Sequence, residues 1–345
     1  MRVDLKSFFS PPTQPLPWSR AFRGALSVGA CAAVGVFMNE PGLGVIAAIC
    51  ALWSWTNDLG GTYLRRLTSM ATAGAMMLLG GAIGGLIADL PQWHFWVVLV
   101  AMLLIGIVHN SSRALENAAR FGGFALVIAA TLGISHLSEA WPVIEGVVWT
   151  IVLMTIEHLI KREEPSEPGT SVRAGLIRMR TGEVIDWHFG VRYAVAVAIG
   201  LAIAEHFGAR RAAWVALTTI AVMRPNDAES AALVGLRAAG TLIGVGIAAI
   251  IVSITHEPSA LVGAAAILAF AISPCMTWQR WAGFTAIIAM AMVLLDLSWL
   301  TQGGDRPLLL ERIYDTGLGC AIALAATVAI PARFRASGGN PPPTR

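Results

Sequence analysis

Charged residues are scarce in this sequence. They make up 13% of its 345 residues, whereas soluble globular domains carry about 25%. Neither sign is in excess, because 24 Lys and Arg residues against 21 Asp and Glu residues leave a net charge of +3. A nucleic-acid partner would require a strong basic excess clustered on one face. The composition therefore excludes a soluble globular surface and argues against nucleic-acid binding. With 56% hydrophobic residues, the lipid bilayer is the expected partner.

Motifs that would hold a metal or a nucleotide are also absent from the sequence. It has only two lysines, Lys6 and Lys161, and neither lies in the Gly-Lys-Ser/Thr sequence of a P-loop. The four cysteines form no C-x-x-C pair and no Cys/His cluster with the spacing of zinc ligands; they are Cys31, Cys50, Cys275 and Cys320. We therefore expect no cofactor, no metal site, no ATP hydrolysis and no enzymatic activity.

Long apolar runs make up most of the chain. About 20 helical residues cross the ~30 Å hydrocarbon layer, and twelve runs approach that length. They lie near residues 21–38, 43–55, 67–88, 93–108, 121–136, 143–160, 189–207, 212–223, 236–254, 260–274, 278–297 and 309–330. The pattern predicts an all-α polytopic membrane protein with about twelve transmembrane helices in two six-helix repeats, in which the second span of each repeat is short.

The polar segments divide the chain into five parts. These are an N-terminal segment (1–20), a first repeat (21–160), a linker (161–188), a second repeat (189–330) and a tail (331–345) that is disordered by composition. If the N-terminus lies inside, the inner segments carry 20 basic residues and the outer segments four. Lys and Arg near span ends stay in the cytoplasm. We therefore expect both termini and the linker to be cytoplasmic.

Paired landmarks indicate an internal duplication. Four polar residues of the first half recur 167 to 171 positions later; the pairs are Arg23 and Arg192, Asp58 and Asp227, Arg66 and Arg237, and Arg113 and Arg280. Six spans per repeat would give both halves the same orientation, around an axis along the membrane normal and with a cavity between them. The alternative explanation is that apolar helices resemble one another by composition alone.

The sequence "MRPND" ends the short second span of the second repeat. Arg224 and Pro225 stop the helix, and Asn226 and Asp227 can cap the next one. One interpretation is a turn that is basic because it faces the cytoplasm. The other is a broken span in which the exposed backbone and Arg224 meet an anionic substrate, as discontinuous helices do in transporters.

Further arginines near span ends extend this candidate substrate-binding set. Arg237, at the inner end of the next span, either snorkels to the interface or points into the cavity. Arg23 and Arg192 are a related pair near span starts, and Arg280 is the counterpart of Arg113 in the second repeat. We expect Arg224 and Arg237 to form an inner-facing anion site together with this pair.

The start of the last span carries the candidate proton-coupling residues. Glu311 and Asp315 lie one turn apart on one helix face, and ionisable groups within spans usually face the protein interior. Asp315 is the deeper of the two, and Glu311 fits a solvated helix end equally well. Arg312 would hold the Asp315 carboxylate ionised unless it snorkels outward. Elsewhere, His109 is a group that could titrate near neutral pH.

Four motifs together resemble a known family. "MRPND", "RAAGTLIG", "WQRW" at 278–281 and "ERIYDTGLGCAIAL" occur in that order. They look like the integral-membrane domain of the fusaric-acid-resistance-like (FUSC) family, which is related to aromatic acid exporters. The resemblance is strongest over residues 189–330. It is weaker in the first half, where "WTND" ending at Asp58 lacks the Arg-Pro pair.

This resemblance implies a multi-pass protein of the bacterial inner membrane that exports small organic acids, aromatic ones among them. From the carboxylates of the last span we expect the export to be proton-coupled. The partners implied are the lipid bilayer, a small organic anion, and a second copy of the chain or efflux subunits. Two alternatives remain: a passive organic-anion channel, as in the more distantly similar plant malate channels, and a membrane assembly subunit without transport of its own. Family members often carry a larger cytoplasmic domain, whereas this chain has only the 161–188 linker.

Overall fold

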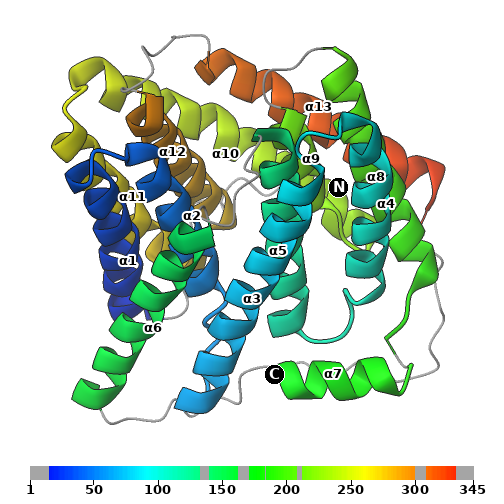
Figure 1. Ribbon diagram of the computed structural model, residues 1–345, viewed down its shortest axis with the longest axis horizontal. Helices are drawn as coiled ribbons and strands as arrows, with labels where there is room; N and C mark the ends of the chain where they lie inside the picture. The colour runs from blue at the N-terminus through cyan, green and yellow to red at the C-terminus, as the bar shows by residue number, and fades with distance from the viewer. Residues whose placement is uncertain are drawn as a thin grey trace.

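The computed structural model describes residues 15–132, 140–161, 171–182, 184–207, 212–299 and 308–331, and within these ranges it is helical without any strand (Figure 1). The all-α prediction is confirmed. Most of the expected N-terminal segment (1–20) and nearly all of the tail (331–345) lie outside the described residues.

The described helices form one set before the linker and one after it. The first set is α1 (Trp18–Phe37), α2 (Pro41–Thr56), α3 (Tyr63–Ile87), α4 (Pro91–Ile107), α5 (Arg113–Leu132) and α6 (Trp141–Lys161). The linker contains α7 (Val172–Arg180). The second set is α8 (Trp187–His206), α9 (Ala212–Val222), α10 (Asp227–Ile254), α11 (Pro258–Trp278), α12 (Arg280–Trp299) and α13 (Leu308–Ala329).

Local sequence signals explain where several helices begin. Pro41, Pro91 and Pro258 occupy the first helical positions of α2, α4 and α11, where the missing N–H costs nothing and the fixed φ suits the helix. Side-chain oxygens of Asp186 and Asn226 accept backbone N–H bonds at the starts of α8 and α10. Such caps satisfy donors that the first turn leaves unpaired.

Seven helices of the described part are long and apolar enough to cross a membrane: α1, α3, α6, α8, α10, α11 and α12. Helices α2, α4 and α9 are apolar but have only 16, 17 and 11 residues. At 1.5 Å per residue, α9 covers about 17 Å, little more than half of the hydrocarbon layer. The twelve-span count is therefore not confirmed, while the short second helix in each set agrees with the sequence pattern.

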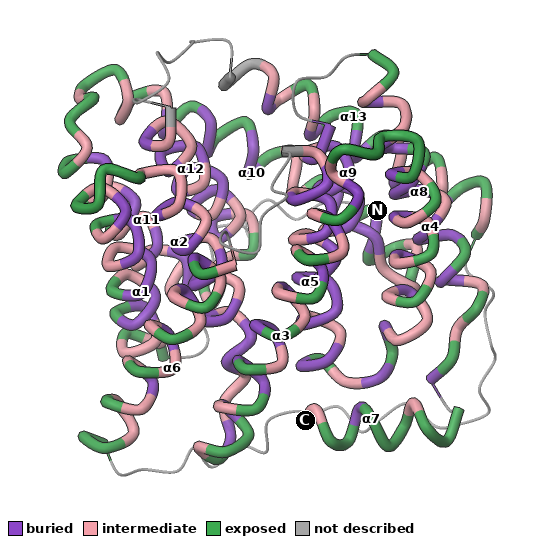
Figure 2. The backbone as a smooth tube through the Cα atoms, viewed as in Figure 1, coloured by how far each residue is buried: buried purple, intermediate pink, exposed green. Residues whose placement is uncertain are grey.

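The two sets pack in the same pattern and complete each other's cores. In the first set α1 contacts α2, α2 contacts α6, and α3 contacts α5; in the second, α8 contacts α9, α9 contacts α13, and α10 contacts α12. Two extensive contacts link the sets, because α4 of the first set packs on α8 of the second, and α11 of the second set packs on α1 of the first. The two largest hydrophobic clusters accordingly draw residues from both sets. Buried residues lie mainly on the helix sides that face one another (Figure 2).

Glycines allow the closest helix contacts. A Cβ on Gly80 of α3 would lie 1.9 Å from the carbonyl oxygen of Gly122 of α5, and a Cβ on Gly244 of α10 would lie 2.8 Å from that of Thr285 of α12. Small residues let membrane helices approach closely, because packing rather than water exclusion holds them together. The α3–α5 and α10–α12 pairs therefore depend on these glycines.

The linker contains a helix that the sequence pattern did not indicate. The nine-residue α7 lies across the end of the bundle, below α5 in the view of Figure 1, and it contacts α5 and α3. Its Arg178 donates a hydrogen bond of 2.9 Å to the carbonyl oxygen of Ser111, and its Gly175 lies against Ser112. We call this end, where α1, α3, α5 and α8 begin, the basic end.

Candidate functional site

The first polar network at the basic end centres on Asp58, directly after α2. Arg66, in the first turn of α3, donates two hydrogen bonds to its carboxylate, from Nε at 2.9 Å and from Nη2 at 2.8 Å. Arg23 of α1 contributes Nη1 at 2.6 Å. All three residues are buried. Asp58 therefore joins the starts of α1 and α3 to the end of α2.

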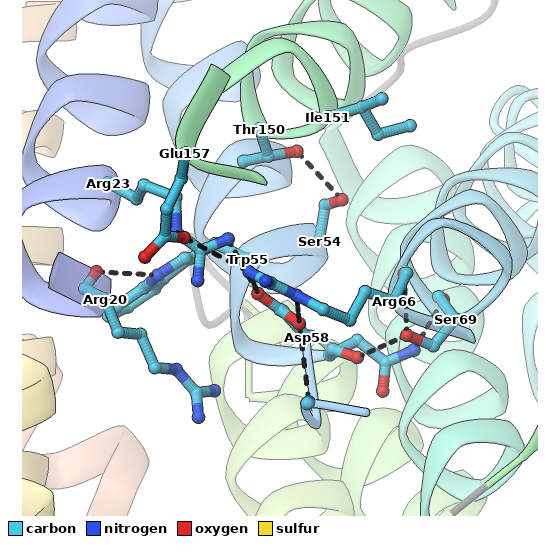
Figure 3. A network of polar contacts seen from close by, with 12 residues as sticks. Arg20, Arg23, Ser54, Trp55, Asp58, Arg66, Ser69, Thr150, Ile151 and Glu157 are labelled. Atoms are coloured by element: carbon cyan, nitrogen blue, oxygen red, sulfur yellow. Dashed lines mark hydrogen bonds and ion pairs between the residues drawn. The ribbon is translucent and has the colours of Figure 1, made fainter. Parts of the chain in front are cut away.

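A second carboxylate, Glu157 near the end of α6, faces the same two arginines. It lies 2.8 Å from Nε of Arg23 and 3.2 Å from Nη2 of Arg66. Figure 3 shows the two guanidinium groups between the carboxylates. Arg20 lies beside this group, over the ring of Trp55 at 5.7 Å. The network therefore brings together four helices of the first set.

Charge decides the protonation state of Asp58. Burial raises the pKa of this carboxyl, but the hydrogen bonds from Arg66 and the charge of Arg23 outweigh burial and lower the pKa to about 2. The carboxylate is consequently ionised at every physiological pH, and we assign it to holding helix ends together.

A matching network lies in the second set. Arg192 of α8 pairs with Asp227 at the start of α10, as Arg23 pairs with Asp58, and both partners lie 169 positions after their counterparts. Arg192 also donates hydrogen bonds to the carbonyl oxygens of Arg224 at 2.6 Å and Pro225 at 3.1 Å. Basic side chains stabilise the unpaired carbonyls at helix ends in this way.

Arg192 also reaches the end of α13, because its Nη1 lies 3.2 Å from the carbonyl oxygen of Ile330. The residue is 1% exposed. Arg23 and Arg192 thus each hold their own helix set together. Arg192 contacts Arg224 through the carbonyl oxygen of that residue, and the predicted joint anion site of these arginines with Arg237 stays a prediction.

The "MRPND" sequence forms the break between α9 and α10. Asn226 accepts N–H bonds from Ala228 at 2.9 Å and Glu229 at 3.3 Å, which confirms its predicted capping role. Arg224 Nη1 donates to the carbonyl oxygens of Ala221 at 3.1 Å and Met223 at 2.7 Å. Burial and then the nearby Arg120 charge lower the pKa of Arg224 to about 10. The substrate-binding role of this segment stays a prediction.

Sequence reasoning missed a cluster formed by the α4–α5 connection and the start of α5. Glu116 Oε1 lies 2.6 Å from Nη2 of Arg120 and 3.3 Å from Nε2 of His109. Burial, followed by the charges of Arg120 and Arg224, lowers the pKa of His109 to about 2, so the expectation of titration near neutral pH is wrong. The i, i+4 spacing of Glu116 and Arg120 was the available signal.

An open pocket of about 410 Å³ lies at the turn between α11 and α12. Its lining combines two indoles, a guanidinium and an amide with apolar groups: Leu236, Met276, Thr277, Trp278, Gln279, Arg280 and Trp281. The indole N–H of Trp281 is buried, and no hydrogen-bond partner for it occurs among the described residues. Trp18 of α1 stacks on Phe270 of α11, which places the following α11–α12 turn at the basic end.

Arg280, one of the predicted substrate-binding residues, thus lines this pocket. Arg237 lies next to Leu236 of that lining, and its Nε is buried without a hydrogen-bond partner among the described residues. Electrostatically it interacts with Cys320 of α13. The expected pairing of Arg237 with Arg224 stays a prediction.

The candidate proton-coupling residues lie far from the basic end. Asp315 and Glu311 are both partly buried on α13, and Asp315 precedes Ile330 by 15 residues, or about 22 Å of helix. Arg312 is 3% exposed and lies 4.1 Å from the centre of the Trp214 ring. It is therefore held by a cation–π contact and does not snorkel outward.

The described residues include no group of three His, Cys, Asp or Glu side chains that could hold a metal ion. Their polar chemistry is dominated by guanidinium groups and indoles. Arginine recognises carboxylates through its planar fork of donors, and indoles offer flat apolar surfaces. This combination suits a small organic anion.

Comparison with known proteins supports the sequence resemblance. Residues 195–326, from within α8 to near the end of α13, match the family described as "Fusaric acid resistance protein-like". A stretch of 156 residues is 31% identical to the inner membrane protein YccS of Escherichia coli (strain K12) and covers 44% of this chain. The chain spans only 20% of the length of that relative. No solved structure matches.

Proposed function

We propose, from the premise that this chain is a membrane protein of the fusaric acid resistance protein-like family over residues 195–326, that it is an inner-membrane permease exporting small organic acids. The observation that carries the proposal is the pocket at the α11–α12 turn. Ligand sites are concave, largely apolar and of about 300 to 1,000 Å³, with a few polar groups that fix orientation. This pocket has about 410 Å³.

The pocket has the chemistry of an aromatic carboxylate site. The guanidinium of Arg280 would bind the carboxylate, and the indoles of Trp278 and Trp281 would contact the ring. The buried indole N–H of Trp281 offers a further donor. Arg280 is exposed, so a ligand can reach it from the basic end.

The architecture that we propose is twelve membrane-embedded helices in two repeats. The matching contacts within α1–α6 and α8–α13 support it, as do the equivalent pairs formed by Arg23 with Asp58 and by Arg192 with Asp227. The short α2, α4 and α9 would be embedded through their neighbours rather than cross the bilayer alone. Discontinuous helices of this kind form substrate sites in transporters.

The proposed orientation places the basic end in the cytoplasm. The sequence puts 20 basic residues on one side and four on the other, and the linker helix α7 lies at the basic end. Asp315, at the far end of α13, would then lie toward the outer side. Proton coupling through Asp315 completes the proposal, and the Arg312 contact with Trp214 would keep that region packed.

The test is reconstitution of the purified protein into liposomes, with benzoate, salicylate and acetate as substrates, with and without a pH gradient. We expect benzoate and salicylate to be moved faster than acetate, and the pH gradient to drive accumulation. Arg280→Gln should lower the flux. Arg180→Gln, an exposed arginine of α7, is the matched control and should leave it unchanged.

Three outcomes would contradict the proposal in different ways. Equal downhill flux in both directions without pH coupling indicates a passive channel. No flux from well-folded protein indicates an assembly subunit. A flux that is equally insensitive to Arg280→Gln and Arg180→Gln removes the α11–α12 pocket from the transport path.

A further inference from the structure

A buried histidine and a carboxylate join the two helix sets at the end of the bundle opposite the basic end. His94, near the start of α4, is 5% exposed. Its Nδ1 lies 2.8 Å from Oε1 of Glu205, in the last turn of α8, and its Nε2 lies 3.0 Å from the carbonyl oxygen of Ile87. Since α4 belongs to the first set and α8 to the second, this pair connects the sets.

The hydrogen bonds of His94 require one proton between the two side chains. A carbonyl oxygen only accepts hydrogen bonds, so Nε2 must carry a hydrogen in order to bond Ile87. Nδ1 and the Glu205 oxygen can then form a hydrogen bond only if one of them also carries a hydrogen, because otherwise two lone pairs would face each other. The His94–Glu205 pair therefore holds one proton more than a neutral imidazole beside an ionised carboxylate.

Loss of that proton would break the contact between the two side chains. Histidine is the side chain whose charge ordinarily changes between pH 5 and pH 8. The side chain of Glu205 is 33% exposed, whereas that of His94 is 6% exposed. An ionised Glu205 can therefore turn toward water and leave the imidazole behind, which avoids a buried charge without a partner.

The other end of the α4–α8 interface is held by backbone packing. A Cβ on Gly106 of α4 would lie 2.7 Å from Cα of Gly190 of α8, so the two helices approach through their backbones there. Gly106 comes 12 positions after His94, or about 18 Å along the helix. The interface is thus packed closely at the basic end, and at the opposite end it depends on one proton.

Other charged groups near this end do not bond the imidazole. The helices packed on α4 and α8 are α3, α5, α9 and α13. Among the described residues at this end of these helices and their connections, the charged and titratable groups besides the pair are Asp89, His206, Glu311, Arg312, Tyr314 and Asp315. Both ring nitrogens of His94 are already used by Glu205 and Ile87. The charged residues of the α5–α6, α8–α9 and α12–α13 connections lie outside the described residues.

We propose that His94 and Glu205 form a proton-binding site that closes the outer end of the α4–α8 interface. A proton taken up from the outer side holds the two helix sets together, and its release to that side lets them separate, because the closed state binds the proton and the open state does not. This inference deepens the proposed function and rests on it for the orientation and the coupling. In an exporter, proton uptake would close the outer end after the anion has left.

The test measures the accessibility of the interface directly, without transport. Val98 follows His94 by one turn on the same face of α4 and is 0% exposed. Val98→Cys is made, and its reaction with a water-soluble maleimide is followed in nanodiscs at pH 5 and pH 8, with the labelled site located by mass spectrometry. Each rate is divided by that of the unfolded protein at the same pH, which removes the pH dependence of the thiol. We expect this relative rate to be at least about tenfold higher at pH 8, because a charged hydrogen bond is lost there.

Two substitutions of the pair should have opposite effects in the Val98→Cys protein. Glu205→Gln supplies an amide N–H that can donate to Nδ1 of the neutral imidazole, so the interface should stay closed and labelling should be slow at both pH values. His94→Ala removes both hydrogen bonds, so labelling should be fast at both. His206→Gln is the matched control, because His206 is the exposed neighbour of Glu205 on α8, and it should keep the pH dependence.

A relative labelling rate that is equal at pH 5 and pH 8 would overturn the inference. So would a pH dependence that persists in Glu205→Gln or disappears in His206→Gln, and these variants decide the matter if His94→Ala does not fold. Failure of the proposed function gives a different result. Labelling that depends on pH and on Glu205, in a protein without flux, leaves the proton site standing and removes the permease. Proton-driven accumulation of benzoate that is unchanged in Glu205→Gln leaves the permease standing and removes this pair from its coupling.

Discussion

The two Arg–Asp pairs occupy equivalent positions, yet Asp58→Asn should destabilise the protein far more than Asp227→Asn. Asp58 is 3% exposed and holds Arg23 and Arg66. Lowering its pKa from 3.8 to about 2 corresponds to about 2.5 kcal/mol of favourable interaction with the carboxylate. Removing one partner of a buried pair costs about 3 to 5 kcal/mol, because the remaining charge stays buried.

Asp227 has a smaller effect because its side chain is 36% exposed and solvent screens the pair. Arg192 also keeps three backbone carbonyl partners when the carboxylate is lost. We therefore expect Asp227→Asn to cost at most about 1 kcal/mol.

Thermal unfolding in detergent, followed by tryptophan fluorescence, compares the two variants with the unmodified protein. The sign of the pH dependence provides an internal check. Since the folded pKa of Asp58 lies below the unfolded value, its contribution is fully present above pH 5 and falls only as the pH drops toward 2. The loss in Asp58→Asn should therefore be constant between pH 5 and 8. An equal loss of thermal stability in both variants, or a larger loss in Asp227→Asn, would refute the reasoning.

Two further predictions concern packing and pH. Gly80→Ala should sharply destabilise the α3–α5 pair, because the new Cβ would lie 1.9 Å from the Gly122 carbonyl oxygen. A Cβ at Gly81 would meet no atom within 4 Å, so Gly81→Ala should be neutral or stabilising. Thermal unfolding of both variants checks this prediction. His109 is held neutral in the folded protein with a pKa of about 2, whereas in the unfolded chain it binds a proton below about pH 6.5. The free energy of unfolding should therefore decrease as the pH is lowered below about 6.5. His109→Gln should reduce this decrease, and a pH profile of stability identical to that of the unmodified protein would contradict the prediction.

Helix positions follow from local sequence, and so do some contacts. Apolar runs bounded by Pro and Trp predict most of the helices, and Asn226 was identifiable as a cap because capping depends on residues two or three positions away. The spacing of 169 residues singled out Arg23 and Asp58 with their counterparts. It did not show that each arginine binds the aspartate of its own half, since a repeat indicates which residues occupy equivalent positions but not which residues are in contact.

Long-range partners could not be predicted from one sequence. Glu157 lies 134 positions after its partner Arg23, with no periodicity to connect the two residues. The orientation of Arg312 was left undecided for the same reason, because its partner Trp214 belongs to another helix. The nine-residue α7 is too short and too basic for an apolar pattern to indicate it.

Because α4 packs on α8 and α11 packs on α1, each helix set is an incomplete folding unit. A set expressed alone would leave the partner faces of two helices uncovered, and it would lack half of each large hydrophobic cluster. Those faces are complementary, so two separate polypeptides cut in the linker have what they need to find each other in the membrane.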